Sequence, residues 1–105
     1  MPNGRNPSEI KRLRNEILMA LRMVYPAALQ ADQVLRSLMV LFPTLEFEQV
    51  KRDLHYLAAK KYVERVLTDD PSESDMTPWR RRWFRLAPSG VEVADRCIHD
   101  PALED

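Results

Sequence analysis

The sequence contains little glycine, little cysteine and no surplus of either charge. Gly4 and Gly90 are its only glycines, which excludes a glycine-rich phosphate loop, and the single Cys97 cannot form a disulfide within the chain. Sixteen basic residues balance sixteen acidic ones, so net charge does not favour a nucleic-acid partner. No apolar run approaches the roughly 20 residues that span a bilayer, and MPNGRNPSEI lacks a signal-peptide core. We therefore expect a cytoplasmic protein with no membrane partner.

The chain has 105 residues, which fits one small domain. We expect a flexible N-terminus at residues 1–6, a single domain at residues 7–99 and a flexible acidic tail at residues 100–105. No internal repeat or linker composition divides this domain.

The first half of the chain shows helical periodicity. Asn6-Pro7-Ser8-Glu9 is typical of a helix start, and the predicted helix runs to about Tyr25, before Pro26. A short extended segment at residues 28–30 precedes a second predicted helix near residues 31–41. Thr44 is the predicted cap of a third helix, whose apolar face carries Phe47, Val50, Leu54 and Leu57.

The second half changes to a strand pattern. Residues 62–67 and 79–86 are predicted strands, separated by the acidic, turn-rich segment at residues 68–78. The apolar spacing of residues 91–98 predicts a short closing helix. This order predicts an α+β fold in which a three-helix core packs beside a β-hairpin.

Two stretches resemble known regulators. QVKRDLHYLAAKKYVERV at residues 49–66 resembles the third helix and first wing strand of MarR-like, PadR-like and ArsR-like proteins. WFRLAPSGVEVAD at residues 83–95 resembles their returning wing strand and the helix after it. The chain is also similar to small winged-helix proteins carried by Mu-like prophages. The resemblance implies a winged-helix regulator of transcription that binds double-stranded DNA. It also implies a homodimer that is formed by the first and last helices.

The resemblance also implies which residues contact DNA. The exposed side of the third helix would enter the major groove, and the arginines of the wing would contact the backbone. The matching positions are Gln49, Arg52, Asp53, Tyr56 and Lys60 on the helix, and Arg80, Arg81 and Arg82 on the wing.

The sequence departs from that family at two places. Where the third helix turns into the wing, such regulators usually carry glycine, because the turn requires a positive φ. Lys61 occupies this position, so we expect a strain of about 1 kcal/mol or a different turn. The wing tip is acidic, with Asp69, Asp70, Glu73 and Asp75, which would repel phosphates.

The stretch PWRRRWFRL at residues 78–86 allows three interpretations. If it is one strand, alternation places Trp79, Arg81, Trp83 and Arg85 on its exposed face. This face can bind phosphate, or it can form a protein interface through Trp79, Trp83 and Arg85. Alternatively, Arg81 and Arg85 can pair across the hairpin with Glu64 or with the loop acids. The rival to DNA binding is therefore a winged-helix module for protein association, inside a phage-related or other assembly.

Residue types for catalysis are scarce. His55 lies among apolar positions of the third helix, and Cys97 with His99 are too few ligands for a metal site. We expect no enzymatic activity, no catalytic residues, no bound metal and no cofactor.

Overall fold

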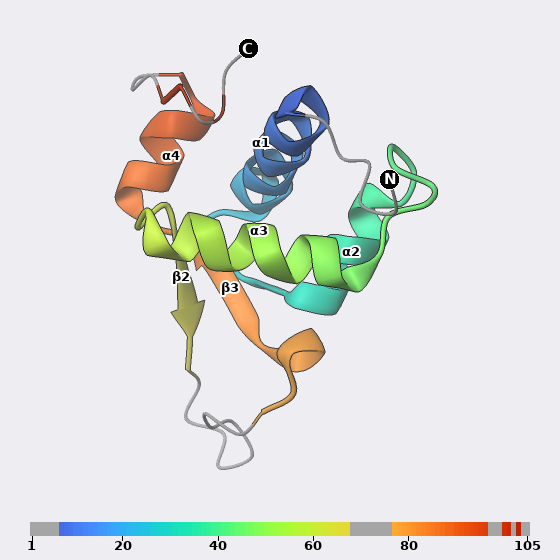
Figure 1. Ribbon diagram of the computed structural model, residues 1–105. Coiled ribbons are helices and arrows are strands. Elements are labelled where there is room, and N and C mark those ends of the chain that lie inside the picture. Colours follow the sequence, from blue (N-terminus) through green and yellow to red (C-terminus); the bar gives the residue numbers. More distant parts are fainter. Residues whose placement is uncertain (1–6, 68–76, 97–99, 102, 104–105) are drawn as a thin grey trace.

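The computed structural model describes residues 7–67, 77–96, 100, 101 and 103. The elements follow one another along the chain in an order close to that expected, and Figure 1 shows their arrangement. They are α1 (Pro7–Val24), β1 (Leu29–Gln30), α2 (Ala31–Leu38), α3 (Phe47–Ala59), β2 (Val63–Val66), the 3₁₀ helix η1 (Trp79–Arg81), β3 (Trp83–Leu86) and α4 (Pro88–Ala94).

The predicted α+β class is confirmed. Within the described residues, four α-helices accompany a three-stranded antiparallel sheet with the order β1-β3-β2. The central strand β3 pairs with β1 through Phe84 and Leu29, and with β2 through Leu86 and Val63. This arrangement is compatible with a winged helix. No helix in the described part of the chain is long and apolar enough to cross a membrane.

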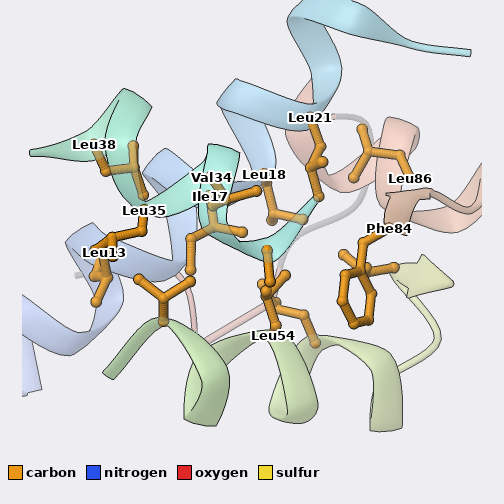
Figure 2. Close-up of a cluster of buried hydrophobic side chains, with 14 of the residues drawn as sticks. Leu13, Ile17, Leu18, Leu21, Val34, Leu35, Leu38, Leu54, Phe84 and Leu86 are labelled. Carbon is orange, nitrogen blue, oxygen red and sulfur yellow. The ribbon is translucent and has the colours of Figure 1, made fainter. Parts of the chain in front are cut away.

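The core forms where α1, α2 and α3 meet one end of the sheet. In Figure 2, leucines and isoleucine from α1 and α2 point toward Leu54 of α3, and Phe84 and Leu86 of β3 close one side. Burying one such side chain contributes about 1.5–3 kcal/mol. The core therefore fixes how α3 and β3 lie relative to each other, which positions the surface considered below.

Helix boundaries differ from the prediction at α2 and α3. The helix α2 ends at Leu38 instead of continuing to Leu41, because the amides of Leu41 and Phe42 both donate to the Leu38 carbonyl in a tight turn. Thr44 was the wrong cap for α3. Glu46 is the N-cap, and its amide donates to the Gln49 side-chain oxygen at 3.0 Å in a capping box.

The predicted strand at residues 79–86 is wrong over its first half. Trp79–Arg81 forms η1, in which the Arg82 amide donates to the Trp79 carbonyl at 3.1 Å. The Gln30 side chain donates to the Arg81 carbonyl, and the Ala31 amide donates to the Arg82 carbonyl at 2.9 Å. The start of α2 therefore occupies the backbone groups that a longer strand would have used. The closing helix also begins earlier than predicted, at Pro88.

The turn from α3 into β2 has the predicted backbone. Lys61 adopts φ of 68°, the left-handed region where glycine is usual. The Lys61 amide donates to the Ala58 carbonyl and its own carbonyl accepts the Ser89 hydroxyl at 2.7 Å. These bonds hold a lysine in a conformation that costs it about 1 kcal/mol.

Two of the three described residues of the expected flexible tail pack against the domain, while Pro101 is exposed. Asp100 and Leu103 are both buried, and the Asn15 side chain of α1 donates to the Leu103 carbonyl. This packing differs from the expectation for residues 100–105. The N-terminal residues 1–6 lie outside the described part of the chain.

Candidate nucleic-acid interface

The buried residues of α3 determine which of its other residues face outward. Phe47, Val50, Leu54 and Leu57 point into the core. With 3.6 residues per turn, the opposite side of the helix carries the exposed residues, which are Glu48, Arg52, His55 and Ala59, with Lys51 half-buried at its edge. This side faces away from α1 and α2.

Trp79 of η1 lies next to this outer side and is the centre of a cluster of ring and cation contacts. Its ring stacks on Phe84 of β3 with centroids 5.4 Å apart. Lys51 Nζ lies 5.6 Å from the ring centroid, and Arg82 Cζ lies 5.1 Å from it. The His55 ring is tilted against it at 6.5 Å. Trp79 therefore joins α3 to the sheet and holds two cations over its ring.

A shallow surface depression of about 330 Å³ lies between α3 and η1. We call this surface, together with the neighbouring Arg82, the α3–η1 face. Its members are Glu48, Lys51, Arg52, His55, Trp79 and Arg82. Three cations against one carboxylate give this face a positive charge on a chain whose net charge is zero. The exposed Arg81 of η1 adds a further positive charge nearby.

Two of the predicted wing arginines are paired with carboxylates. Arg80 Nη1 lies 2.9 Å from Asp32 Oδ1 of α2, and its guanidinium is 4.4 Å from the Phe47 ring. Arg85 Nε lies 2.9 Å from Glu64 Oε1 of β2. This ion pair across the hairpin is the one that the structural interpretation of this stretch predicted. These two arginines therefore bind elements of the fold to one another.

The other two arginines of this stretch, Arg81 and Arg82, differ from each other in exposure. Arg82 Nε donates to the Thr77 carbonyl at 2.8 Å, which keeps its guanidinium beside Trp79. Arg81 is exposed, and no ion pair joins it to a carboxylate within the described residues. Arg81 is thus the wing arginine whose charge is best placed to meet an anionic partner.

The predicted row of Trp79, Arg81, Trp83 and Arg85 does not exist as one face. Alternation holds within β3, where Phe84 and Leu86 are buried while Arg85 is exposed and Trp83 half-buried. It fails before Trp83, because Trp79 and Arg81 belong to η1, and Trp79 stacks on the buried side of the strand. A protein interface made by Trp79, Trp83 and Arg85 together is therefore not formed as a single strand face.

Asp53 and Tyr56 were wrongly expected on the exposed side of α3. The Asp53 side chain is only 1% exposed and accepts a hydrogen bond from Arg14 Nε of α1 at 3.4 Å. Arg14 Cζ also lies 3.7 Å from the centroid of the half-buried Tyr56 ring. Both residues therefore join α3 to α1 and are turned away from the α3–η1 face.

Gln49 and Lys60 have structural partners as well. The Gln49 side chain takes part in the α3 capping box. Lys60 Nζ lies 3.3 Å from the buried Asp100, which also accepts the Tyr62 hydroxyl at 2.6 Å. The hydrogen bond to Asp100 raises the pKa of Tyr62 to about 12, with burial and the Asp100 charge adding to the effect.

Of the predicted residues of α3, only Arg52 lies on the outer side, while Lys51 and His55 were missed. Phe47, Val50, Leu54 and Leu57 define the centre of the buried side, and a strict 100° step places residues 48, 52, 55 and 59 opposite them. The expected set was rotated toward α1 because the polar Asp53 and Tyr56 were assumed to avoid the core.

Several predicted features lie outside the described residues. The acidic wing tip with Asp69, Asp70, Glu73 and Asp75 is among them, as is the Cys97 and His99 pair. No family model, curated protein or solved structure matches the chain.

Proposed function

We propose that the chain is a small winged-helix protein that binds double-stranded DNA and regulates transcription. The observation that carries this proposal is the α3–η1 face, where cations from a helix and from the wing converge on Trp79. A duplex is a dense array of phosphates, and a convex helix flanked by cations fits its major groove.

In this proposal, the outer side of α3 lies in the major groove. The exposed Arg52 guanidinium can donate two parallel hydrogen bonds to O6 and N7 of guanine, and His55 can donate to a base acceptor. Lys51, at the edge of the helix, is placed to meet a phosphate beside the groove. Arg52 and His55 thus take the role that the sequence had assigned to five residues of this helix.

The 3₁₀ helix η1 contacts the neighbouring backbone. Arg81 is exposed there, and Arg82 is oriented by the Thr77 carbonyl and by the Trp79 ring. An arginine that is held in place loses less side-chain entropy when it binds phosphate than a freely rotating one. Arg80 is omitted from the revised contact set, because its ion pair with Asp32 anchors η1 to α2.

The carboxylates near α3 restrict how the duplex approaches. Glu46 and Glu48 are exposed at the N-terminal end of the helix, where they repel phosphates. Glu48 lines the same depression as Lys51 and Trp79, so it lies close to the cations of the α3–η1 face. The proposal therefore requires the backbone to pass along η1, with the start of α3 directed toward base edges, where a carboxylate can accept from cytosine N4.

Charge reversal tests this proposal directly. Fluorescence anisotropy with a labelled duplex should show that Arg52→Glu and Arg81→Glu each weaken binding at least about 10-fold, the effect of losing a well-placed charged contact. Lys11→Glu makes the same charge change on α1, away from the α3–η1 face, and should change affinity by less than about 2-fold. Equal losses from all three variants would contradict a localised interface.

A second candidate function is protein association, and one observation favours it. Exposed apolar side chains of α1 and of the residue Leu41 after α2 line a groove between these two helices. Charged DNA does not bind an apolar surface, so this surface favours a protein partner.

A further inference from the structure

Exposed apolar side chains are concentrated on one part of the domain. Apart from Leu67, every exposed large apolar residue in the described part of the chain lies on α1, or in the residues that directly follow α1 and α2. These are Met19, Met23, Tyr25, Met39, Val40 and Leu41. Met23 and Val40 are the extremes, at 84% and 85% exposure. Scattered apolar residues are normal on a protein surface, whereas a cluster of this kind marks an interaction site.

Part of this cluster surrounds a groove of about 360 Å³ between α1 and α2. Ala20, Leu29 and Leu38 contribute to its lining, and Met19, Met23 and Leu41 rise at its edges. Glu16 is the only charged residue among those that line it. Methionine side chains are flexible and adapt to the shape of a partner, so the groove is suited to close packing.

The groove and α3 lie on opposite sides of α1. Arg14 contacts Asp53 and Tyr56 of α3, and Met23 follows Arg14 by about two and a half helical turns, which places it on the other side of the helix. A partner in the groove therefore leaves the α3–η1 face uncovered. This inference stands on its own observations and does not rest on DNA binding.

We propose that the groove holds a second copy of the chain, related by a two-fold axis. In such a pair the same surface must be its own complement, so it needs both a hollow and a projection that fits it. The groove provides the hollow, and the highly exposed Met23 beside it provides the projection. Met23 of each copy inserts into the groove of the other and is removed from water there.

Charge supports a second copy as the occupant. The chain has no net charge, so two copies approach one another without overall repulsion. The groove contains one carboxylate and no cation, which gives a strongly charged partner nothing to pair with beyond Glu16. An uncharged, methionine-rich surface matches the groove, and the exposed apolar surface around the groove has this composition in the second copy as well.

This pairing differs from the one that the resemblance implied. The first and last helices were expected to form the dimer, but α4 is tied to α1 within the chain by the Arg22–Asp95 ion pair at 3.0 Å. The proposed interface uses α1 with α2 instead. Because each copy has α3 on the far side of α1, the pair directs its two α3–η1 faces away from each other, toward separate stretches of DNA.

Sedimentation velocity over a concentration series tests the proposal. The wild-type chain should reach twice its monomer mass of 12.3 kDa, and Met23→Glu should weaken the dimer at least about 30-fold, as expected for a central interface residue. Leu67→Glu is the matched control, since Leu67 is 61% exposed but lies at the end of β2. It should dimerise like the wild type.

Both substitutions are at exposed positions, so circular dichroism should show the same thermal unfolding for the two chains at a concentration low enough that both are monomeric. A wild-type chain that stays monomeric at the highest concentrations overturns the proposal, as does a Met23→Glu chain that dimerises normally. Arg52→Glu, which tests DNA binding, should leave the dimer unchanged, so the two proposals can fail separately.

Discussion

The Asp53 carboxylate of α3 is buried against the Arg14 guanidinium of α1, with 3.4 Å between Oδ1 and Nε. Arg14 also covers the Tyr56 ring, so one arginine joins two residues of α3 to α1. A buried carboxylate without its cation is costly, because its desolvation is then uncompensated. This pair fixes which side of α3 faces outward, and it removes Asp53 and Tyr56 from the proposed DNA contact.

The Arg14–Asp53 pair should be measurable as stability. Arg14→Met keeps the aliphatic stem but removes the guanidinium from beside the buried Asp53, and it should lower the free energy of unfolding by about 3 kcal/mol. Asp53→Asn leaves Arg14, whose side chain is 18% exposed, able to reach water, and it should cost less, about 1–2 kcal/mol. Urea denaturation measures both. If Asp53→Ala leaves stability unchanged but reduces DNA affinity, our placement of Asp53 is wrong.

Gly90 of α4 should tolerate no side chain. A Cβ at this position would overlap the Tyr62 carbonyl oxygen, which already accepts the Ala87 amide at 3.0 Å. We expect Gly90→Ala to destabilise the domain by about 3 kcal/mol, because backbone must move. Ser89→Ala, the neighbouring control, loses only the hydrogen bond to the Lys61 carbonyl and should cost about 1 kcal/mol. Equal costs for the two variants would show that α4 is placed differently.

The left-handed backbone of Lys61 predicts that glycine at this position stabilises the fold. Because its φ is 68°, Lys61→Gly should relieve strain and raise the free energy of unfolding by up to about 1 kcal/mol. Ala59→Gly lies two positions earlier in the helix α3 and should have the opposite effect, a loss of about 1 kcal/mol. Thermal unfolding of the two variants gives the comparison. Loss of stability in Lys61→Gly would contradict the turn geometry.

The raised pKa of Tyr62 predicts how the stability of the fold depends on pH. Its pKa is raised from 10.0 to about 12 in the folded chain, so between these values the unfolded chain has released a proton that the folded chain retains. The stability contributed by Tyr62 is therefore complete below pH 10 and is lost as the pH rises toward 12. Ultraviolet titration of tyrosinate should show a component near 12 that disappears in Tyr62→Phe. A Tyr62→Phe chain that keeps this component would contradict the Tyr62–Asp100 hydrogen bond.

Much of the fold could be predicted because its signals are local. Pro7 at the first turn, the apolar face of α3 and the need for positive φ at Lys61 each depend on a few neighbouring residues. The end of η1 is held instead by hydrogen bonds from Gln30 and Ala31, which are far from it in sequence. The alternation of residues within 79–86 carries no information about Gln30 and Ala31, so the predicted strand was too long.

The site was harder to predict for a related reason. Asp53 is polar, and polar residues on a helix are usually exposed, but Arg14 comes from another helix and makes its burial tolerable. Arg80 and Arg85 were candidates for binding an anionic partner, yet each forms an ion pair with a carboxylate of another element, Asp32 and Glu64. Charge along the sequence could not show which arginines were already paired. Only Arg52, Arg81 and Arg82 of the predicted contacts keep that role in our proposal.

The central claim is that the α3–η1 face binds duplex DNA, and the salt dependence of binding tests it most directly. Affinity should fall with a log–log slope of about −3, as expected for release of counterions when Lys51, Arg81 and Arg82 contact phosphates. Arg81→Ala should reduce the slope by about 1 for every sequence, whereas Arg52→Ala should relax sequence preference. No binding by a folded chain at low salt, or a slope that Arg81→Ala leaves unchanged, would contradict the claim.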